Sequence, residues 1–382
     1  MTISFFSNFL NIHQLPFCEE LIKHIGEDSF RFVATSKMAQ DRVAMGFEDM
    51  NVTKPFVVRA YEGGSSYKEA LRLAIESDVA IMGSAPLEYS EVRMKKNRLT
   101  FQYSERLLKL GLRVFFMPGF YRSIYRQFLR YRNKNMYVLC ASAYTAPDLE
   151  HLFFPREKCF KWGYFPEVIY GTNHLVENDE GLKHPQDVSI LWAGRLIGWK
   201  HPEAAILLAK ELEKNGYNYS MKIIGDGELR PSLEKMIVDD SLTERVKMLG
   251  ALPHEDVMDA MKNADIYIFT SDRNEGWGAV LNEAMDAGCV VVACDAIGSA
   301  PFLIKDGVNG FLYKDGDTND LFKKVSTLID TPSSVEAISQ KAIDTIRGEW
   351  SIQQATNNLL SLIDCLISGK PTVIKCGPCS PA

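Results

Sequence analysis

The sequence has no apolar run of the roughly 18 residues that a membrane-spanning helix needs, so we expect no transmembrane segment. Its first residues, MTISFFSNFLNIH, have neither a basic n-region nor a small-residue cleavage site, and we do not interpret them as a signal peptide. Repeats and low-complexity segments are also missing. The eight cysteines are scattered, mostly within apolar runs, which is typical of buried free thiols in a reducing cytoplasm. We therefore expect a cytoplasmic protein.

Two short motifs imitate functional sites that their surroundings do not support. CGPC at 376–379 has the spacing of a redox dithiol, but no βαβ unit follows it, and we predict a frayed tail. DGD at 315–317 resembles a metal-binding acidic pair, but its position predicts a turn that opens the next helix. The chain also lacks a G-x-G-x-x-G turn followed about twenty residues later by an acidic residue, which argues against an NAD-dependent Rossmann enzyme.

Length and composition indicate a globular protein of two domains. The chain has 382 residues, of which 46% are hydrophobic and 24% charged. Its net charge of −6 is unevenly distributed, because residues 1–170 hold 23 Lys and Arg against 18 Asp and Glu, whereas residues 171–382 hold 20 against 31. The halves therefore carry +5 and −11, and we expect them to meet different partners.

Apolar runs alternate with amphipathic helical patterns along the whole chain. The second half has strand-like runs at 188–194, 221–225, 245–250, 265–270 and 289–295, and helical patterns at 202–215, 229–238, 254–263 and 278–287. The first half has the runs ISFFSNF, FRFVAT, FVVRAY, VAIMG, RVFFM and MYVLCAS. Continuous apolar strands separated by helices predict parallel sheets covered on both faces, that is, an α/β fold.

These patterns predict two doubly wound, Rossmann-like domains that face each other across a cleft. The first domain spans 1–170 and the second 187–350, and the polar stretch at 171–186 is typical of a linker. A C-terminal helix and tail follow at 351–382, and this helix can pack back on the first domain. Ligands of such folds bind in the loops that follow the strands, so we expect the site there.

The stretch NEGWGAVLNEAMDAGCVVVACD, residues 274–295, holds two glutamates at opposite ends of a short predicted helix. Glu275 and Glu283 have two interpretations. A glycosidase uses two carboxylates on either side of one bond; alternatively, one carboxylate faces the chemistry and the other holds a ligand. Gly276 and Gly278, on either side of Trp277, let the backbone approach a ligand, and we expect the helix N-terminus to bind an anion.

Five motifs in the second half occur in a characteristic order. They are AGRLIGWKHPE (193–203), IIGDGELRPSLEKM (223–236), VKMLGALPHEDVMDAMKNADIYIFTS (246–271), EGWGAVLNEAMDAGCVVVACDAIGSAPFLI (275–304) and DGVNGFLYKDGD (306–317). Together they resemble the donor-binding half of the retaining "group 1" glycosyltransferases (family 4) of the GT-B fold. The likeness is greatest to the bacterial enzymes that build capsule, exopolysaccharide or O-antigen chains.

The resemblance implies a retaining, metal-independent enzyme without a cofactor, whose nucleotide-sugar donor is a co-substrate and whose acceptor is lipid-linked or a glycan. Nucleic acid is not an expected partner. The leaving diphosphate needs cations, and the resemblance gives that role to Arg195 and Lys200. It places Glu275, with residues 276–278, against the donor sugar and Glu283 against the ribose hydroxyls, which argues against the glycosidase interpretation. The loop at Gly225 and Asp226 lies along the donor in relatives, although a plain turn explains it equally well.

The first half gives weaker signals. Asn11, His13 and Gln14 follow the first strand and should reach the cleft, where they would bind acceptor or donor phosphate; a loop-capping histidine is the alternative. Relatives carry a Gly-Gly pair in this loop and a histidine near the middle of the first domain, whereas this chain has no histidine between His24 and His151. That departure leaves open a catalytically silent GT-B subunit that binds a nucleotide sugar or supports a partner enzyme.

The segment FYRSIYRQFLRYRNKNMY, residues 120–137, places three arginines on one stripe of a predicted helix. Arg122, Arg126 and Arg130 have aromatic and aliphatic neighbours on the adjoining stripes. Such a basic amphipathic helix suits anionic lipid headgroups, so we expect peripheral contact with the inner face of the cytoplasmic membrane. A core helix whose arginines are solvated is the alternative.

Overall fold

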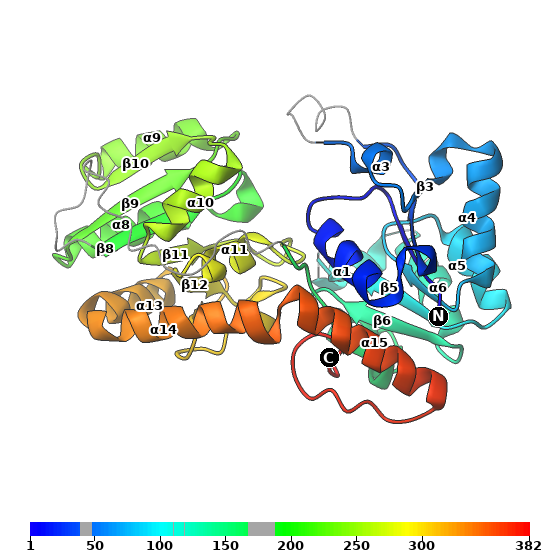
Figure 1. Ribbon diagram of the computed structural model, residues 1–382. Coiled ribbons are helices and arrows are strands. Elements are labelled where there is room, and N and C mark those ends of the chain that lie inside the picture. The colour runs from blue at the N-terminus through cyan, green and yellow to red at the C-terminus, as the bar shows by residue number, and fades with distance from the viewer. Residues whose placement is uncertain (39–47, 110, 118, 167–187) are drawn as a thin grey trace. The chain divides into compact units, whose positions relative to one another are not determined.

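The computed structural model describes residues 1–38, 48–109, 111–117, 119–166 and 188–382 (Figure 1). The chain forms two compact units. Unit 1 comprises residues 1–167 and 350–382, and unit 2 comprises residues 168–349. The predicted linker at 171–186 lies outside the described residues.

Unit 1 contains a seven-stranded parallel sheet of order β3-β2-β1-β4-β5-β6-β7. Its strands are β1 (Ile3–Ser7), β2 (Phe30–Ala34), β3 (Val57–Arg59), β4 (Val79–Met82), β5 (Thr100–Ser104), β6 (Met136–Cys140) and β7 (Cys159–Lys161). Its helices are α1 (Leu15–Ile25), α3 (Met50–Thr53), α4 (Gly64–Glu76), α5 (Leu87–Lys95), α6 (Phe120–Gln127), α7 (Thr145–His151) and α15 (Ile352–Ser368). Short 3₁₀ turns are η1 (Glu27–Ser29), η2 (Ala60–Glu62), η3 (Gly111–Phe116), η4 (Leu129–Tyr131) and η5 (Arg156–Lys158).

The central strand of unit 1 explains why its sequence is a continuous apolar run. Every residue of β1 is buried, because helices cover both faces of a parallel sheet. Phe5 lies beside Phe32 of β2 and Ile81 of β4 in the register of the sheet. Burial of such large side chains on both sides of one strand makes β1 the centre of the unit 1 core.

The fifth strand was predicted in the wrong place. The run RVFFM does not form a strand: it lies in the turn η3 and just after it, where Phe116 is 88% exposed. The fifth strand of the chain is instead β5, which was not predicted because polar residues interrupt its apolar pattern. Two of them have partners inside the core, since Thr100 Oγ1 accepts from the guanidinium of Arg93 and Gln102 Nε2 donates to the carbonyl of Met82. Buried polar side chains are tolerated in a strand when they are hydrogen-bonded in this way.

Arg93 itself is a structural feature of unit 1 that composition alone does not reveal. Its side chain is completely buried, and it donates hydrogen bonds to five oxygen atoms, four of them main-chain carbonyls. Two of these carbonyls, of Ala74 and Ser77, lie at the end of α4, where helix carbonyls lack partners. Arg93 therefore joins the end of α4 to the starts of β4 and β5.

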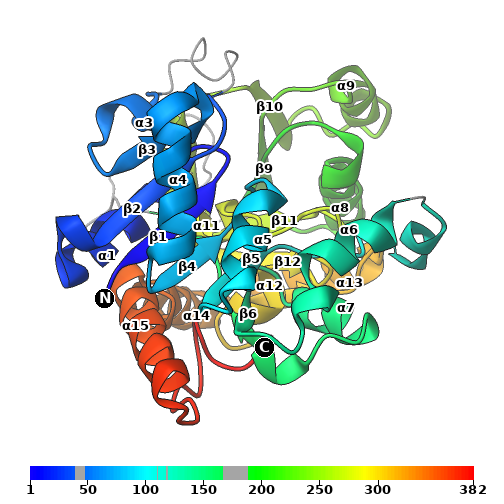
Figure 2. The ribbon, with the colours of Figure 1, turned by 90° about the vertical axis from the view of Figure 1, so that its right-hand side faces the viewer.

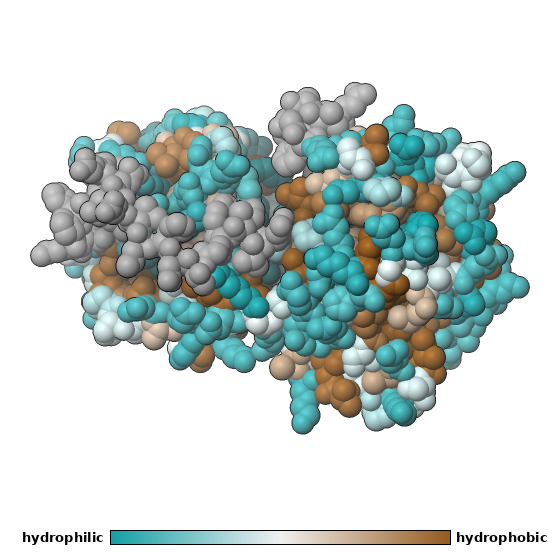
Figure 3. All heavy atoms as spheres, in the orientation of Figure 1, coloured by the Kyte–Doolittle hydropathy of each residue, from teal (hydrophilic) through white to brown (hydrophobic). Residues whose placement is uncertain are grey.

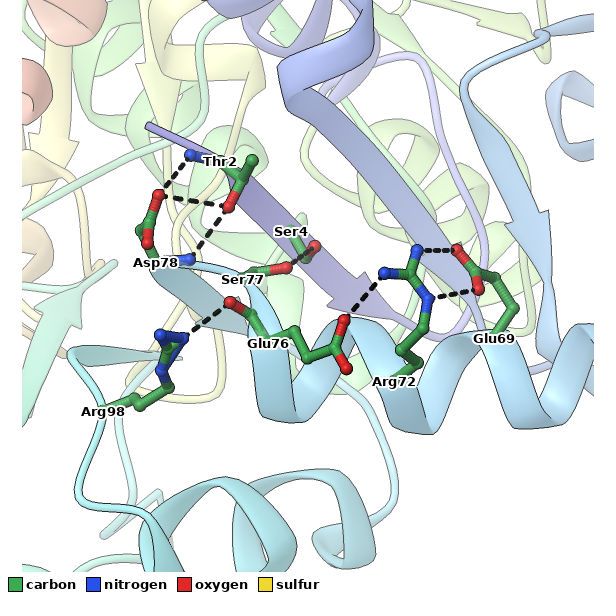
Figure 4. Close-up of polar contacts among 8 residues, drawn as sticks. All are labelled: Thr2, Ser4, Glu69, Arg72, Glu76, Ser77, Asp78 and Arg98. Carbon is green, nitrogen blue, oxygen red and sulfur yellow. Dashed lines mark hydrogen bonds and ion pairs between the residues drawn. The ribbon is translucent and has the colours of Figure 1, made fainter.

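A polar network fastens the amino end of β1 to the α4–β4 connection (Figure 4). Thr2 and Asp78 bond reciprocally, because Thr2 N donates to Asp78 Oδ2 at 2.8 Å and Asp78 N donates to Thr2 Oγ1 at 3.0 Å. Next to them, the hydroxyls of Ser4 and Ser77 bond at 2.6 Å inside the protein. These contacts lie at the edge of the sheet opposite to the loops that follow the strands.

The chain returns to unit 1 after residue 349. There α15 packs beside α1 (Figure 1), and the tail that follows pairs with the edge strand β7. The predicted frayed tail is wrong: Cys379 is fully buried, its N–H donates to the carbonyl of Lys161, and Lys161 N donates to Ser380. These main-chain bonds cover the open edge of the sheet, which otherwise exposes unpaired groups.

The outer surface near this return carries apolar side chains. Ile367, in the last turn of α15, is 62% exposed, and Val373 in the tail is 72% exposed. Figure 3 shows brown patches on this face of unit 1 around α15 and the tail, among mostly hydrophilic side chains.

Unit 2 contains a six-stranded parallel sheet of order β10-β9-β8-β11-β12-β13. Its strands are β8 (Val188–Ala193), β9 (Tyr219–Ile224), β10 (Val246–Gly250), β11 (Ile266–Phe269), β12 (Val290–Cys294) and β13 (Phe311–Tyr313). Its helices are α8 (Glu203–Lys214), α9 (Arg230–Asp239), α10 (His254–Lys262), α11 (Val280–Asp286), α12 (Ala300–Leu303), α13 (Thr318–Asp330) and α14 (Pro332–Asp344), with a 3₁₀ turn η6 (Gly198–Lys200) and a π-helical turn η7 (Thr345–Glu349).

The strand order reverses once in each unit, and these reversals fix where ligands bind. In unit 1 the reversal falls between β1 and β4, and in unit 2 between β8 and β11. Open parallel sheets bind ligands outside the carboxyl ends of their strands at such a switch point. Ligand sites are therefore expected at the loops that follow β1 and β4 in unit 1 and at those that follow β8 and β11 in unit 2.

Candidate functional site

Three loops at the carboxyl edge of the unit 2 sheet are joined by main-chain hydrogen bonds. Gly194 N donates to the carbonyl of Ile224 at 2.9 Å, and Leu196 N donates to that of Asp226 at 2.9 Å. Gly225 N in turn donates to the carbonyl of Gly250 at 2.8 Å. The loops that follow β8, β9 and β10 therefore pack together as one continuous main-chain surface.

Two glycines make this close approach possible. A Cβ on Gly225, whose φ is +136°, would overlap the carbonyl oxygen of Gly194. A Cβ on Gly227 would lie 2.5 Å from the carbonyl oxygen of Leu196. Only a residue without a side chain fits at either position, so the GDG sequence is required for the packing of the loops.

The neighbouring Asp226 acts within the turn. Its Oδ1 accepts from Gly227 N at 2.7 Å, and its Oδ2 lies 3.3 Å from a guanidinium nitrogen of Arg230. Between the two interpretations of this loop, these contacts favour the turn. Arg230, at the start of α9, was not singled out from the sequence.

Two linked hydrogen bonds, which we call the relay from Trp192 to Lys200, hold the main chain of Lys200 in place. Lys200 is the last residue of the turn η6, and its carbonyl accepts a hydrogen bond of 2.7 Å from Thr270 Oγ1. The same hydroxyl accepts from Trp192 Nε1 at 2.8 Å. Trp192 and Thr270 are 2% and 3% exposed, so this relay lies inside the sheet and fixes the main chain of Lys200.

The ammonium group of Lys200 forms an ion pair with Glu275. Ser271 Oγ also donates to the same carboxylate oxygen, at 3.0 Å. The side chains of Lys200 and Glu275 are 15% and 12% exposed, so both groups are largely withdrawn from water. The sequence had assigned them separate roles, whereas the structure joins them directly across the switch point.

Arg195 lies at the outer side of this pair. It is exposed, and its guanidinium carbon lies 5.9 Å from the centre of the Trp199 ring, while Lys200 Nζ lies 4.8 Å from the same ring. Among the described residues, no carboxylate pairs with Arg195. Two cations therefore gather around one indole, and one of them is open to solvent.

The loop from Glu275 to Gly278 precedes α11, which begins at Val280 and has only seven residues. Gly278 has φ +86°, and a Cβ there would lie 2.7 Å from the ring of Phe269. Gly276 is buried. Trp277, which the sequence placed at the donor, is 1% exposed, and its Nε1 donates to Asn282. Its side chain belongs to the core of unit 2.

Glu283 lies within α11 and is half-buried. Burial raises the pKa of Glu283, and the nearby imidazole of His254 offsets part of that rise. Its carboxylate accepts no hydrogen bond from the described residues. A carboxylate that is partly withdrawn from water is stabilised when a ligand donates hydrogen bonds to it.

The switch point of unit 1 opens into a cavity of about 730 Å³. It is lined by the loops after β1, β4 and β5, by Ser123 and Gln127 of α6, and by Tyr164. Asn11, His13 and Gln14, which the sequence predicted to reach a cleft, all line it. Among the described lining residues none is Lys or Arg, and Glu105 is the one carboxylate.

The three predicted residues of unit 1 have different tasks. Asn11 Oδ1 accepts from the N–H groups of His13 and Gln14, at 3.0 and 3.1 Å, so Asn11 rather than the histidine caps this loop. The His13 ring stacks on Tyr164 with ring centres 5.9 Å apart. Gln14 Oε1 is buried and has no hydrogen-bond partner among the described residues.

Two lining residues, Glu105 and Tyr164, were missed. Tyr164 Oη donates to Glu105 Oε1 at 2.6 Å, and Lys109 lies 3.2 Å from the second carboxylate oxygen. Glu105 belongs to no motif, and Tyr164 lies in WGYFPE (162–167), which gives the family resemblance only loose support. The position of Glu105 directly after β5 would have pointed to it, but β5 itself was not predicted.

The predicted membrane helix is shorter than expected. The helix α6 ends at Gln127, so Arg130 lies in η4 instead of continuing the stripe. Arg126 and Arg130 both pair with Glu91 of α5, at 2.8 and 3.2 Å, and Figure 2 shows α6 beside α5. Arg122 is exposed and has no carboxylate partner among the described residues.

Exposed apolar side chains surround α6 in addition to the arginines. Phe116, Met117, Tyr121 and Tyr125 are 88%, 51%, 60% and 50% exposed. Tyr121 and Tyr125 are four residues apart and share one face of α6. We call these four side chains and Arg122 the α6 ridge.

A second cavity of unit 1, of about 330 Å³, lies at the amino edge of the sheet. Three of its charged groups bind one another, since Arg72 pairs with both Glu69 and Glu76 (Figure 4). In the described residues, no three His, Cys, Asp or Glu side chains are placed to hold a metal ion, and no helix is long and apolar enough to cross a membrane.

The sequence of unit 2 matches a known family. Residues 177–345 match the family described as "Glycosyl transferases group 1". The chain is 30% identical over 173 residues to alpha-D-kanosaminyltransferase of Streptomyces kanamyceticus, which is 45% of this chain and 44% of that protein. It is 29% identical over 186 residues to the amylovoran biosynthesis glycosyltransferase AmsK of Erwinia amylovora, 47% and 46% of the two chains. The matches thus span about half the length of these relatives.

The fold of the whole chain also has a solved counterpart. HepE of Anabaena, solved in complex with UDP, superposes with a TM-score of 0.69 at 18% sequence identity, covering 94% of this chain and 100% of that one. At that identity the likeness concerns the fold alone. With its two doubly wound parallel sheets, the chain has the two-domain GT-B fold predicted from the sequence.

Proposed function

We propose, on the premise that unit 2 of this chain belongs to the group 1 glycosyltransferases, that the protein transfers a sugar from a nucleoside diphosphate sugar to a lipid-linked or glycan acceptor in polysaccharide biosynthesis. The observation that carries the proposal is the Lys200–Glu275 ion pair, with the open Arg195 beside it, at the switch point of unit 2. HepE was solved with UDP and with UDP-glucose, so a UDP-sugar is the first donor to test.

The two cations suit the leaving group. Cleavage of the donor places negative charge on the diphosphate, and preorganised cations stabilise that charge most when they are withdrawn from water. Lys200 meets this condition because its main chain is anchored and its ammonium group is largely buried. Arg195 supplies the planar fork that binds two phosphate oxygens.

We assign the two glutamates to different parts of the donor. Glu275 is oriented by Lys200 and Ser271, and we assign it to the hydroxyls of the donor sugar. Glu283 lies on α11, where burial raises its pKa, and we assign it to the ribose hydroxyls, which can donate two hydrogen bonds to its carboxylate. No carboxylate is assigned as a nucleophile. Transfer with retention then proceeds on one face of the sugar: the acceptor oxygen bonds to the anomeric carbon as the phosphate oxygen leaves, and that phosphate oxygen takes the acceptor proton.

The unit 1 cavity is assigned to the acceptor. Its lining is rich in amide and hydroxyl groups and in aromatic rings, and it contains one carboxylate and no described cation. Such a lining favours an uncharged sugar over a phosphate. The face of α6 that lines the cavity carries Ser123 and Gln127, while Tyr121 and Tyr125 on the same helix are exposed.

This arrangement supports a lipid-linked acceptor. The α6 ridge combines exposed aromatic side chains with Arg122, which pairs with no carboxylate among the described residues, and this is the composition of a surface that rests on anionic lipid headgroups. A lipid anchored beside α6 would hold its sugar near the cavity that the same helix lines. The proposal therefore places unit 1 peripherally on a membrane, with the phosphate of the lipid near Arg122.

Donor chemistry is tested by the release of nucleoside diphosphate from UDP-, GDP- and dTDP-sugars. We expect Arg195→Ala and Lys200→Ala each to lower turnover by roughly 10²–10³. Lys214→Ala, which removes a well-exposed lysine of the same unit, should leave turnover unchanged. Glu275→Gln should lose turnover and keep nucleotide affinity. Wild-type turnover in Lys200→Ala would refute the diphosphate assignment.

Membrane contact is tested by cosedimentation with vesicles containing phosphatidylglycerol. The double change Tyr121→Ser with Tyr125→Ser should weaken binding strongly, and Arg122→Gln should weaken it about fivefold, since a basic residue near an anionic surface contributes about 1 kcal/mol. Val52→Ser is the matched control, because Val52 is 60% exposed and lies on α3, a different helix of unit 1. If the wild type ignores these vesicles at low salt, the acceptor is not presented by a membrane.

A further inference from the structure

A histidine follows Lys200 in an unusual backbone conformation. His201 has φ +48°, the left-handed region that residues with a side chain seldom adopt. Such a conformation persists only where surrounding contacts hold it. The contacts are two carboxylates: His201 Nδ1 lies 2.7 Å from Glu203 Oε1, and Nε2 lies 3.5 Å from Asp272 Oδ2.

Both ring nitrogens of His201 thus face groups that only accept hydrogen bonds. A neutral imidazole carries one N–H, so it can satisfy one of the two carboxylates, whereas an imidazolium donates to both. The charged groups around the ring are Glu203 from α8 and Asp272 from the loop after β11, with Lys200 and Arg273 as chain neighbours of His201 and Asp272. The carboxylates that contact the ring favour its protonated form.

Asp272 connects this histidine to Glu275. Asp272 N donates to the carbonyl of Trp199, its Oδ1 accepts from Asn274 N at 2.7 Å, and its carbonyl accepts from Glu275 N at 3.0 Å. Asp272 is therefore the first residue of the turn that presents Glu275. Two ion pairs, Lys200–Glu275 and His201–Asp272, join the same two loops side by side.

We propose that His201 is a positioning residue whose protonated ring clasps the loop after β11 to the loop after β8, and so holds Lys200 and Glu275 in register for sugar transfer. The proposal rests on the function proposed above. It adds that the register depends on pH, because loss of one ring proton leaves Asp272 or Glu203 without its donor.

The sign of the pH effect follows from the contacts. Burial of His201 lowers its pKa, but the hydrogen bonds and charges of Glu203 and then Asp272 outweigh that effect and raise the pKa above its usual value. The clasp is thus complete below about pH 6.5, the unfolded value, and is lost as pH rises through the higher folded value. Activity that depends on the clasp should fall as pH rises through that raised pKa.

The first arm of the test is a pH titration of the ¹⁵N-labelled histidine rings by NMR, which needs no substrate. We expect the pKa of His201 to lie above about 6.5, the usual value for histidine, and to fall in Asp272→Asn, which keeps an oxygen acceptor for Asn274 but removes the charge. A pKa of His201 at or below that usual value would overturn the proposal, whether or not the protein proves to be a glycosyltransferase.

The second arm compares kcat and KM for the donor from pH 6 to 9. His201→Asn tolerates the left-handed backbone and keeps an N–H donor group but carries no charge, so we expect its kcat to be roughly tenfold lower than wild type at pH 6.5 and to converge with wild type at pH 9. His201→Gly should behave alike, and His151→Asn should match wild type throughout. A loss in His201→Asn of equal size at every pH would show a merely structural residue and overturn the proposal. If no donor is turned over, the function fails while the NMR arm still decides the clasp.

Discussion

The hydroxyl of Thr270 offers a sharp test of how the sheet positions Lys200. Thr270→Val keeps the shape of the side chain but removes the oxygen that accepts from Trp192 Nε1 and donates to the carbonyl of Lys200. Two hydrogen bonds of about 1 kcal/mol each are lost, and a buried indole N–H is left without a partner, which adds to the loss. We expect the free energy of unfolding to fall by about 2–4 kcal/mol.

Thr270→Ser is the matched control, because it keeps the hydroxyl and removes one methyl group, at about 1 kcal/mol. Urea unfolding measured by tryptophan fluorescence and circular dichroism gives the stabilities, and nucleoside diphosphate release gives turnover. We expect Thr270→Val to lower turnover further than Thr270→Ser, since the main chain of Lys200 loses its anchor. Equal stability and turnover in the two variants would refute the relay from Trp192 to Lys200.

Three further predictions concern packing and ionisation. Gly225→Ala should lower the free energy of unfolding by at least about 2 kcal/mol, because the added Cβ would overlap main-chain atoms. In the control Gly216→Ala, where no atom lies within 4 Å of the added Cβ, thermal unfolding should show a loss of about 1 kcal/mol. The hydrogen bond from Thr2 N lowers the pKa of Asp78, so Asp78→Asn should be less stable than wild type at pH 7, and the difference should vanish as acid unfolding passes below the folded pKa. Burial raises the pKa of Glu283, so Glu283→Gln should stabilise the free protein at pH 7, and this difference in stability should fade below about pH 4.3. The same variant should bind nucleoside diphosphate more weakly in calorimetry. A variant that is not stabilised and keeps full affinity would contradict the assignment.

The sequence predicted β11 and β12 of unit 2 well because both are buried along their whole length and are therefore continuously apolar. The run at 289–295 became β12, which is buried along its whole length. The strand β13 was not predicted, because it has only three residues. In unit 1 the same rule failed in both directions: RVFFM carries the exposed apolar side chains of Phe116 and Met117 and forms no strand, and β5 holds two buried polar side chains, Thr100 and Gln102, with partners supplied by α5 and β4.

The site was predicted residue by residue, but its contacts were not. Lys200 and Glu275 are 75 positions apart, and only the parallel order of β8 and β11 brings their loops together. Trp277 was taken for a ligand contact because it stands between two glycines, yet its indole is in the core. The roles of Asn11, Glu105 and His201 depend on side-chain contacts across loops, which no spacing in the sequence encodes.

The tail shows a further limit of local patterns. Residues 376–382 have no periodicity and end the chain, which predicted fraying. Their order comes from an edge strand more than 200 positions earlier, as the bond from Arg156 Nε to the carbonyl of Ala382 illustrates. Pairing of this kind is decided by the tertiary fold alone.

The central claim is that unit 2 binds a nucleoside diphosphate through Lys200, Arg195 and Glu283. Calorimetric titration of the wild type with UDP, UMP and uridine, repeated with the guanosine and thymidine series, tests it most directly. The account predicts that one diphosphate binds at least about tenfold more tightly than its monophosphate and nucleoside, and that Arg195→Ala with Lys200→Ala removes this preference. Equal binding of diphosphate and nucleoside in all three series, or an unchanged preference in the double variant, would contradict it.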